Sequence, residues 1–430
     1  MQIENVKGTY DYAKDEQIIR EKIKDSLKKL FKKYGYSPIE TPLICYFDLL
    51  TAKYEEEDEI VKEVYKVTDR GNRKLGLRYD LTVPFAKFIA LEKNLRLPFK
   101  RYEIGDAFRD GPVKVGRDRQ FVQCDVDVVG LDNQEIEAEL ISLFIKGCKE
   151  LNIPVEVQYN NRKLMQGIIE SLGVEPNKIS SIIKIVDKIK KINEEELRAE
   201  LFSLDVDAKN QELLLKYFKM NFLQLEASFK NTDIININSG LAEIKKLKEL
   251  IDYLGLTNQT KFVPSLVRGQ EYYTGNVFEA YAINSQIKSS IGGGGRYDKM
   301  ITEWINDGKA YPAVGISFGL SVIYEIIKNR EESQTKSLVD IYIIPMGTNK
   351  ESLKLADDLR EISFNVEVEM QSQKLKKCFE YANREKIPYV IVLGENELTQ
   401  NSFKIKDMLS GEEKSIFFDK LEVIQSIIKR

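Results

Sequence analysis

Arginine is the residue type whose placement points most directly to chemistry. Arg109, Arg117 and Arg119 flank a loop-like segment, residues 110–116, that joins two strand-like runs. A planar guanidinium binds phosphate or carboxylate through two parallel hydrogen bonds. Three guanidinium groups around one loop therefore suit a polyanion such as ATP. The arginines taken alone favour the alternative, a solvated and charged hairpin.

The strand-like run after this loop carries polar side chains on one face. Gln123, Asp125 and Asp127 alternate with apolar residues, and alternate residues of a strand point to the same side. A buried carboxylate beside an amide could bind a cationic or hydrogen-bonding small ligand. Acids on an exposed sheet face are an equally good interpretation.

Two further segments combine glycine with arginine and tyrosine. Residues 266–275 read LVRGQEYYTG, and residues 291–298 read IGGGGRYD. Glycine lets a backbone approach a ligand closely, but the four-glycine run fits neither GxxxxGK[ST] nor GxGxxG. Its spacing alone predicts a flexible turn. The small apolar segment 313–320 predicts a strand that continues into a helix.

Helices and strands alternate irregularly around these segments. A helical stripe runs over residues 16–34, strand-like runs cover 75–79, 99–104 and 121–129, and a helix is expected from about 133 to 151. Residues 174–253 are rich in Lys, Ile, Leu, Glu and Asn at helical spacing, which predicts a helical insertion. After a polar stretch at 328–336, strands and helices alternate in a separate small α/β domain.

Composition excludes several classes of site. The chain has 430 residues, which is enough for two or three domains, and a net charge of −3, so a nucleic-acid surface can exist only as a local patch. The absence of histidine excludes Ser-His-Asp and Cys-His nucleophiles and HExxH zinc sites. Four widely spaced cysteines argue against a disulfide framework and fit a reducing cytoplasm, and no signal or membrane segment is expected.

Taken in order, these motifs resemble those of the histidyl-tRNA synthetases, a family of class II aminoacyl-tRNA synthetases. The resemblance begins at Gly8-Thr9 and covers nearly the whole chain. The segment with Pro42 is similar to the first class II motif, residues 108–127 to the second and residues 313–320 to the third. The RGxxYYxG and GGRYD segments are similar to the two signatures specific to this family and its paralogues. The C-terminal domain is similar to the anticodon-binding domain.

The resemblance implies an α+β fold, in which an antiparallel class II synthetase sheet is flanked by helices. A catalytic domain would span residues 1–327, with the helical insertion at about 174–253. A linker at 328–336 and an α/β anticodon-binding domain at 337–430 would follow. The family also implies a homodimer formed through the first motif, no membrane association and a cytoplasmic location.

The activity implied is ATP-dependent attachment of L-histidine to tRNA(His) through histidyl-adenylate, with release of AMP and pyrophosphate. Mg²⁺ would accompany ATP, and no protein metal ligand is assigned. By resemblance Arg268 and Arg109 would be catalytic, and Arg109 and Arg117 would bind ATP. The residues expected to bind histidine are Asp80, Leu81, Thr82, Arg109, Gln123, Asp127, Arg268, Tyr272, Tyr273 and Tyr297.

Some positions depart from the family pattern. Val322 stands where the third motif usually has an arginine that clamps the nucleotide, Asp118 replaces an aromatic residue, and Gln270-Glu271 replaces a common Leu-Asp. The alternative function is therefore a non-catalytic paralogue, such as a regulatory subunit of ATP phosphoribosyltransferase. The C-terminal domain and the intact signature residues argue against it.

Overall fold

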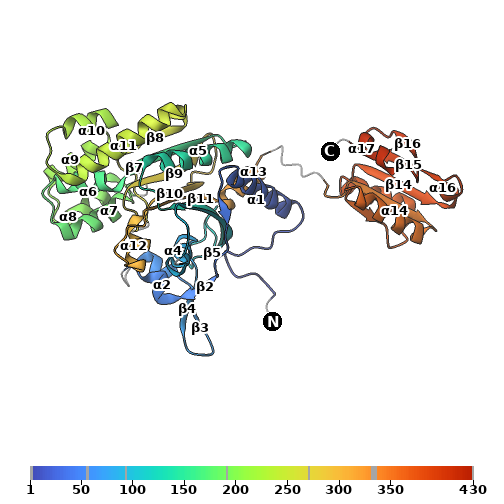
Figure 1. Ribbon diagram of the computed structural model, residues 1–430, viewed down its shortest axis with the longest axis horizontal. Coiled ribbons are helices and arrows are strands. Elements are labelled where there is room, and N and C mark those ends of the chain that lie inside the picture. Colours follow the sequence, from blue (N-terminus) through green and yellow to red (C-terminus); the bar gives the residue numbers. More distant parts are fainter. Residues whose placement is uncertain are drawn as a thin grey trace. The chain divides into compact units, whose positions relative to one another are not determined.

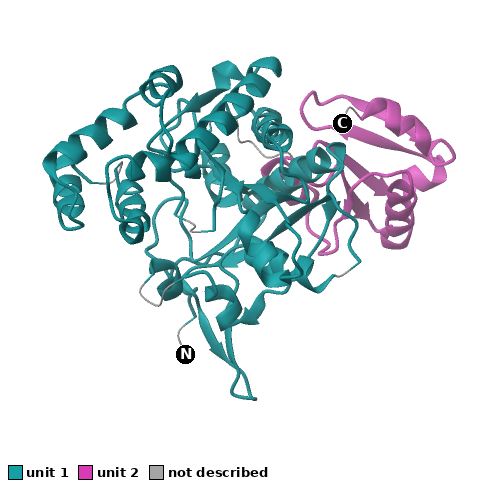
Figure 2. Cartoon of the chain, turned by 60° about the vertical axis from the view of Figure 1, so that its left-hand side comes forward, with its two compact units in different colours: residues 1–330 teal, residues 331–430 magenta. Residues whose placement is uncertain are grey.

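The computed structural model describes residues 3–54, 58–92, 94–189, 192–269, 272–330 and 337–428. The chain folds as two compact units, residues 1–330 and 331–430 (Figure 2). Residues 331–336 of the expected linker lie outside the described residues, as do Gln270 and Glu271. Within the described part, no helix is both long and apolar enough to cross a membrane.

An eight-stranded sheet forms the centre of the first unit, in the order β1-β5-β6-β11-β10-β9-β7-β8 (Figure 1). Every pairing from β5 to β7 is antiparallel, and only the outer strands β1 and β8 pair in parallel. The strands are β1 (Ser37–Pro38), β5 (Phe99–Phe108), β6 (Gln120–Val129), β7 (Val155–Asn161), β8 (Thr260–Phe262), β9 (Asn276–Ala282), β10 (Gly292–Arg296) and β11 (Ala313–Gly319). This arrangement confirms the expected α+β fold with an antiparallel sheet.

Helices α1 (Asp15–Lys33), α5 (Gln134–Glu150) and α13 (Leu320–Lys328) pack on the sheet through one apolar cluster. Phe318 of β11 stacks on Phe144 of α5 with ring centroids 4.2 Å apart, and Phe31 of α1 lies 5.8 Å from Phe318. A second cluster joins α4 (Thr82–Leu91) and α12 (Asp298–Ile305). Between these clusters the sheet has a rigid support on which side chains can be positioned.

The four-glycine run is the main difference from the sequence prediction, because it forms strand β10 and not a flexible turn. Gly292–Gly295 pair with β9 on one side and with β11 on the other. A Cβ atom on Gly294 would overlap the carbonyl oxygen of Gly315 and lie 2.6 Å from Ile316 Cα. Only glycine therefore fits at this position. A glycine inside a strand often marks such a close approach of two backbones.

The helical insertion follows β7, and three of its helices begin at a side-chain cap. Asn193, Asp207 and Asn221 accept hydrogen bonds from backbone N–H groups at these three helix starts. The elements are α6 (Arg162–Glu170), η1 (Pro176–Lys178), α7 (Ile179–Val186), α8 (Glu194–Phe202), α9 (Ala208–Phe218), α10 (Phe222–Ser228), α11 (Ile235–Tyr253) and η2 (Thr257–Gln259). Their buried side chains belong to the same apolar cluster as the sheet.

A small sheet of order β2-β4-β3 projects from the first unit (Figure 1). It comprises β2 (Ile44–Tyr46), β3 (Lys66–Thr68) and β4 (Lys74–Leu77). Two short helices, α2 (Phe47–Thr51) and α3 (Glu59–Glu63), lie between β2 and β3 in the chain. Leu43, Ile44, Tyr46 and Val67 are exposed apolar side chains on this projection. Ile44 and Tyr46 lie two residues apart on β2, so their side chains face the same side of this sheet.

The second unit has its own five-stranded sheet, in the order β13-β12-β14-β15-β16, and its own apolar clusters. The predicted strand–helix alternation is present up to β14, while the antiparallel hairpin β15–β16 was not predicted. Its elements are β12 (Ile341–Met346), α14 (Asn349–Glu361), β13 (Val366–Val368), α15 (Leu375–Arg384), β14 (Tyr389–Gly394), α16 (Glu395–Thr399), β15 (Ser402–Asp407), β16 (Glu413–Phe417), η3 (Leu421–Val423) and α17 (Ile424–Ile427).

Candidate active site

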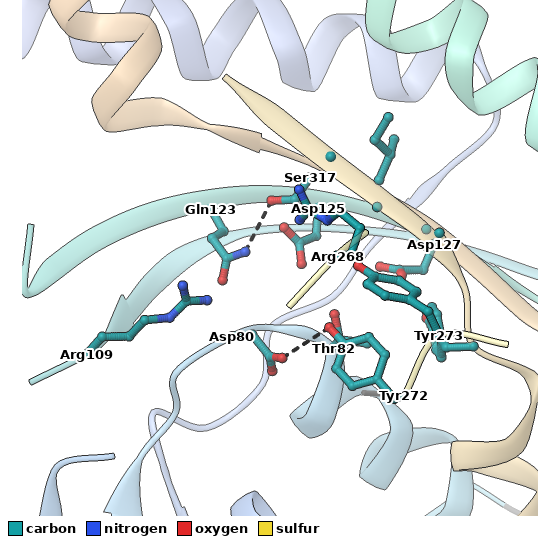
Figure 3. Close-up of a pocket in the computed structure, with 16 residues that line it drawn as sticks. Asp80, Thr82, Arg109, Gln123, Asp125, Asp127, Arg268, Tyr272, Tyr273 and Ser317 are labelled. Carbon is teal, nitrogen blue, oxygen red and sulfur yellow. Dashed lines mark hydrogen bonds between the residues drawn. The ribbon is translucent and has the colours of Figure 1, made fainter. Parts of the chain in front are cut away.

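A cavity lies on the sheet of the first unit, over β6, β11 and β10 (Figure 3). Glycines of β10 and β11 form its floor, so the backbone is accessible where side chains would otherwise fill the space. The lining residues are Asp80, Thr82, Arg109, Gln123, Asp125, Asp127, Arg268, Tyr272, Tyr273, Gly293, Gly294, Gly295, Tyr297, Gly315, Ile316 and Ser317.

The cavity brings together most of the residues expected to bind histidine, although they lie far apart in the sequence. Two of the expected residues do not line it. Leu81 is fully buried, and its carbonyl accepts a hydrogen bond of 3.2 Å from Arg101 Nη2. The half-exposed guanidinium of Arg117 pairs with Glu63 at 2.7 Å. No motif in the sequence pointed to this partner on α3.

Asp127 is held at one end of the cavity by two buried partners. The Tyr297 hydroxyl donates to Asp127 Oδ1 at 2.7 Å, and Arg101 Nη2 lies 2.7 Å from Asp127 Oδ2. Arg101 also pairs with Glu103 at 3.4 Å, and Glu103 pairs with Arg78 at 2.8 Å. Burial raises the pKa of Asp127, with the positive charge of Arg101 acting against it. This buried ionic chain fixes a hydrogen-bond acceptor beneath the ligand space.

Asp80 is held on the opposite wall, at the start of α4. The Val83 N–H donates to Asp80 Oδ1 at 3.0 Å, and the Tyr272 hydroxyl donates to Oδ2 at 3.4 Å. Burial raises the pKa of Asp80, while the Val83 N–H, the positive charge of Arg109 and the Tyr272 hydroxyl lower it. The ring of Tyr272 contacts those of Tyr273 and Tyr297, with centroids 4.9 and 5.9 Å apart. The three rings form an aromatic wall with polar tips.

Two arginines supply positive charge at the cavity. Arg268 Nη1 lies 3.2 Å from Glu279 Oε1 on β9, and the Tyr281 hydroxyl donates to Glu279 Oε2 at 2.5 Å. Burial acts to lower the pKa of Arg268, but Tyr273 and Glu279 outweigh it and raise the pKa, so this group stays charged. Arg109 Nε donates to the Tyr79 carbonyl at 3.1 Å, which aims the guanidinium at the cavity.

Asp125, Ser317 and the floor glycines are lining residues that were not among the expected site residues. The alternation of the strand-like run predicted that Asp125 shares one face with Gln123 and Asp127, and this pattern was the signal for it in the sequence. Ser317 pairs across the sheet with Asp125 in register. Nothing in the apolar segment 313–320 marked this serine in advance.

Two departures from the family pattern, Asp118 and Val322, lie beside the loop 110–116. A Cβ atom on Gly116 would lie 3.0 Å from Val322 Cγ2, so the loop packs directly on Val322. Burial raises the pKa of Asp118, and the charge of Arg20 opposes that rise. Among the described residues, no group of three or more His, Cys, Asp or Glu side chains could hold a metal ion.

Comparisons with known proteins identify the relatives of this chain. The histidyl-tRNA synthetase family model matches residues 8–323, and an anticodon-binding domain model matches residues 340–426. Histidine–tRNA ligase 1 of Bacillus cereus is 42% identical over 421 residues, which cover 97% of this chain and 98% of the relative.

Two solved structures have the same fold. Histidyl-tRNA synthetase from Nostoc sp. PCC 7120 superposes with a TM-score of 0.85 at 25% identity, and all of both chains is covered. An ATP phosphoribosyltransferase regulatory subunit/histidyl-tRNA synthetase from Bacillus halodurans C gives a TM-score of 0.77 at 19% identity, over 91% of this chain and 98% of that one. The family model and the 42% identity extend over far more than half of the sequence, and the chain therefore belongs to the histidyl-tRNA synthetase family.

Proposed function

We propose that the protein attaches L-histidine to tRNA(His), using ATP and passing through histidyl-adenylate, in the cytoplasm. The observation that carries this proposal is the cavity itself. Its lining combines two buried carboxylates, Asp80 and Asp127, with the arginines Arg109 and Arg268, and this set of charges suits a ligand with an imidazole, an ammonium and anionic groups. The four cysteines are buried and free, which agrees with a reducing compartment.

The ring of histidine is assigned to the end of the cavity at Asp127. Asp127 would accept a hydrogen bond from one ring nitrogen, and a tyrosine hydroxyl of Tyr272 or Tyr297 would face the other. These polar groups are buried, so an apolar side chain of similar size would leave them without partners. A site of this kind rejects such analogues strongly. The ammonium group is assigned to Asp80 and Thr82, on the opposite wall.

Adenylate formation needs positioning and charge neutralisation more than it needs a protein base. The histidine carboxylate is already ionised and attacks the α-phosphorus of ATP, while the bond to pyrophosphate breaks in line. Arg268 and Arg109 would stabilise the charge on the α-phosphate oxygens, because a guanidinium forks onto such oxygens. This chemistry suits a chain that contains no histidine.

ATP binding would draw on Arg117 and a divalent cation as well as on Arg109. Arg117 would exchange its partner Glu63 for a phosphate group, because its guanidinium is half-exposed although the Glu63 side chain is buried. Mg²⁺ would be held largely by the phosphates. When bound, it would neutralise phosphate charge.

In the second step, the 3′-terminal ribose hydroxyl of tRNA(His) attacks the carbonyl carbon of the adenylate, and AMP leaves. The matched anticodon-binding domain, residues 340–426, is the part proposed to contact the anticodon. The exposed apolar side chains Leu43, Ile44 and Tyr46 are proposed as part of a homodimer interface. Sedimentation of Tyr46→Glu should give a larger monomer fraction than wild type, and an unchanged dimer would exclude Tyr46 from the interface.

Histidine-dependent exchange of pyrophosphate into ATP tests the proposed activity. Wild-type protein should catalyse exchange only with histidine, and Arg268→Ala should lower the rate by at least about 100-fold, as loss of a transition-state charge donor does. Histidine binding without exchange would instead support the regulatory paralogue. Charging of tRNA(His) transcripts then tests the second step.

A further inference from the structure

Two fully buried asparagines lie side by side where the sheet meets the helical insertion. Asn161 ends β7 and Asn276 begins β9, and the two residues pair in register across the antiparallel strands. Asn161 Nδ2 donates to Asn276 Oδ1 at 2.8 Å. A buried amide is tolerated where its hydrogen bonds are made, because an unpaired buried polar group is costly. The further partners of these two amides therefore show what the pair connects.

Each amide also binds a carboxylate on a helix. Asn161 Nδ2 donates to Glu243 Oε2 of α11 at 2.6 Å. On the other side, Asn276 Nδ2 donates to the carboxylate of Glu137 on α5. Glu137 in turn pairs with Arg296 of β10, with Nε and Oε1 2.6 Å apart. A continuous chain of hydrogen bonds thus runs from the insertion helix α11 to β10, the strand whose glycines form the floor of the cavity.

Asn276 directly follows the segment that carries the aromatic wall of the cavity. Tyr272 and Tyr273 lie on this segment, and Gly275 is its last residue before β9. The Arg162 N–H, at the start of α6, donates to the Gly275 carbonyl at 2.8 Å. The end of the segment is therefore held by the backbone of α6 and, through the asparagine pair, by a side chain of α11. A shift of this end would move both tyrosine rings.

We propose that Asn161 is a positioning residue for histidine binding, which connects the segment 272–276 to the insertion helix α11 through Glu243. Asn161 is not one of the described residues that line the cavity, so it acts through Tyr272 and Tyr273 and not by touching the ligand. The insertion then holds the aromatic wall in the conformation that binds the amino acid. This inference rests on the proposed function, since it takes histidine as the ligand.

Asn161→Asp breaks this connection and keeps the local start of α6. Asn161 Oδ1 accepts hydrogen bonds from the Lys163 and Leu164 N–H groups at 2.8 and 3.3 Å, and an aspartate at the same position can accept both. The donor Nδ2 is replaced by an oxygen, which faces the two former acceptors. Amide hydrogen exchange of residues 272–276 should become at least about tenfold faster. Histidine affinity, measured by calorimetry on the full chain, should fall by about 10- to 100-fold.

Two further variants separate positioning from stability. Asn221→Asp makes the same change at an exposed helix cap of the insertion, where Oδ1 accepts from the Gln224 N–H, and it should leave exchange and affinity at wild-type values. In the double variant Asn161→Asp, Glu243→Gln, the new amide can donate to the new carboxylate. The melting temperature should then recover from that of Asn161→Asp. Histidine affinity should stay low, because the hydrogen bond to Asn276 remains broken.

Each other outcome has a definite meaning. Recovery of histidine affinity together with the melting temperature would overturn the proposal, because Asn161 would then act on stability alone. Unchanged hydrogen exchange of residues 272–276 in Asn161→Asp would also overturn it, as would an equal rise in the KM for ATP and the KM for histidine. Histidine binding with the expected pattern but no pyrophosphate exchange would refute the proposed function and leave the role of Asn161 intact. A wild-type protein that does not bind histidine would overturn both.

Discussion

Gly315 is the position at which a single methyl group most directly tests the histidine pocket. A Cβ atom there would overlap the Asp127 carboxylate oxygen Oδ1 and lie 2.6 Å from Asp127 Cγ and 3.0 Å from the Val126 carbonyl oxygen. In Gly315→Ala the carboxylate must therefore move. It would leave the position where it accepts from Tyr297 and pairs with Arg101, each at 2.7 Å.

The size of the effect follows from what remains unpaired. Breaking a buried ion pair costs about 3–5 kcal/mol, and overpacking of this kind costs about 1–3 kcal/mol. In Gly315→Ala, Asp127 keeps its charge but loses its buried partners. We therefore expect the free energy of unfolding of the first unit to fall by about 3–5 kcal/mol, as for a broken buried ion pair. Each kcal/mol corresponds to roughly 2–4 °C in a large domain, so the melting temperature should fall by roughly 10 °C. Histidine affinity should fall by at least about 100-fold, since the loss of the ring acceptor adds about 3 kcal/mol.

Gly319→Ala is the matched control, because it adds the same methyl group to the same strand. Its Cβ atom would lie 3.4 Å from its nearest neighbour, the Ile291 carbonyl oxygen, which is an ordinary contact. Melting is followed by circular dichroism, and histidine binding by calorimetry well below the lower melting temperature. If Gly315→Ala were as stable as Gly319→Ala and bound histidine with wild-type affinity, the close packing of β11 against Asp127 would be refuted.

Three further predictions concern charges around the cavity. Glu279→Gln removes the ion pair that orients Arg268, so kcat for pyrophosphate exchange should fall about tenfold with little change in KM for histidine, and an unchanged kcat would show that Arg268 needs no such support. Burial and the neighbouring Asp127 raise the native pKa of Asp125 above its unfolded value of about 4. The native state therefore binds the proton more tightly than the unfolded state does, and the free energy of unfolding falls as pH rises through the native pKa. The melting temperature of Asp125→Asn should therefore exceed that of wild type by a margin that grows with pH, and a margin that shrinks would contradict the shift. Glu63→Gln frees Arg117 and should lower the KM for ATP by at most about fivefold, in line with a pair whose arginine is half-exposed, while a higher KM would mean that Glu63 positions Arg117 for ATP.

The architecture was largely readable from the sequence because its signals are local. Helical periodicity marked α1, α5 and the insertion, and period-two alternation placed Gln123, Asp125 and Asp127 on one face. The four-glycine run was misread as a turn because nothing local shows that Gly294 lies against the backbone of Gly315. Glycine runs in loops and in tightly packed strands look alike until the neighbouring strand is known.

The partners of the site residues could not be predicted, because they are distant in the chain. Glu63 lies 54 residues from Arg117, and Glu137 lies 159 residues from Arg296 of the GGRYD segment. That arginine is 1% exposed and pairs with Glu137, so its visible role is to hold β10 to α5. Motif matching finds a charged residue but does not say whether it faces a ligand or another side chain.

The apolar clusters also decide which parts of this chain can be exchanged as modules. The helical insertion is continuous with the core of the sheet, and at its base a Cβ atom on Gly240 would lie 2.7 Å from Leu164 Cβ, so α11 and α6 are in close contact. Cutting out residues 174–253 would expose the interior of the catalytic unit. The second unit keeps all its buried clusters to itself. Recombination that adds, removes or replaces residues 337–430 would therefore leave the described apolar clusters of the first unit intact, whereas the insertion can change only by gradual substitution.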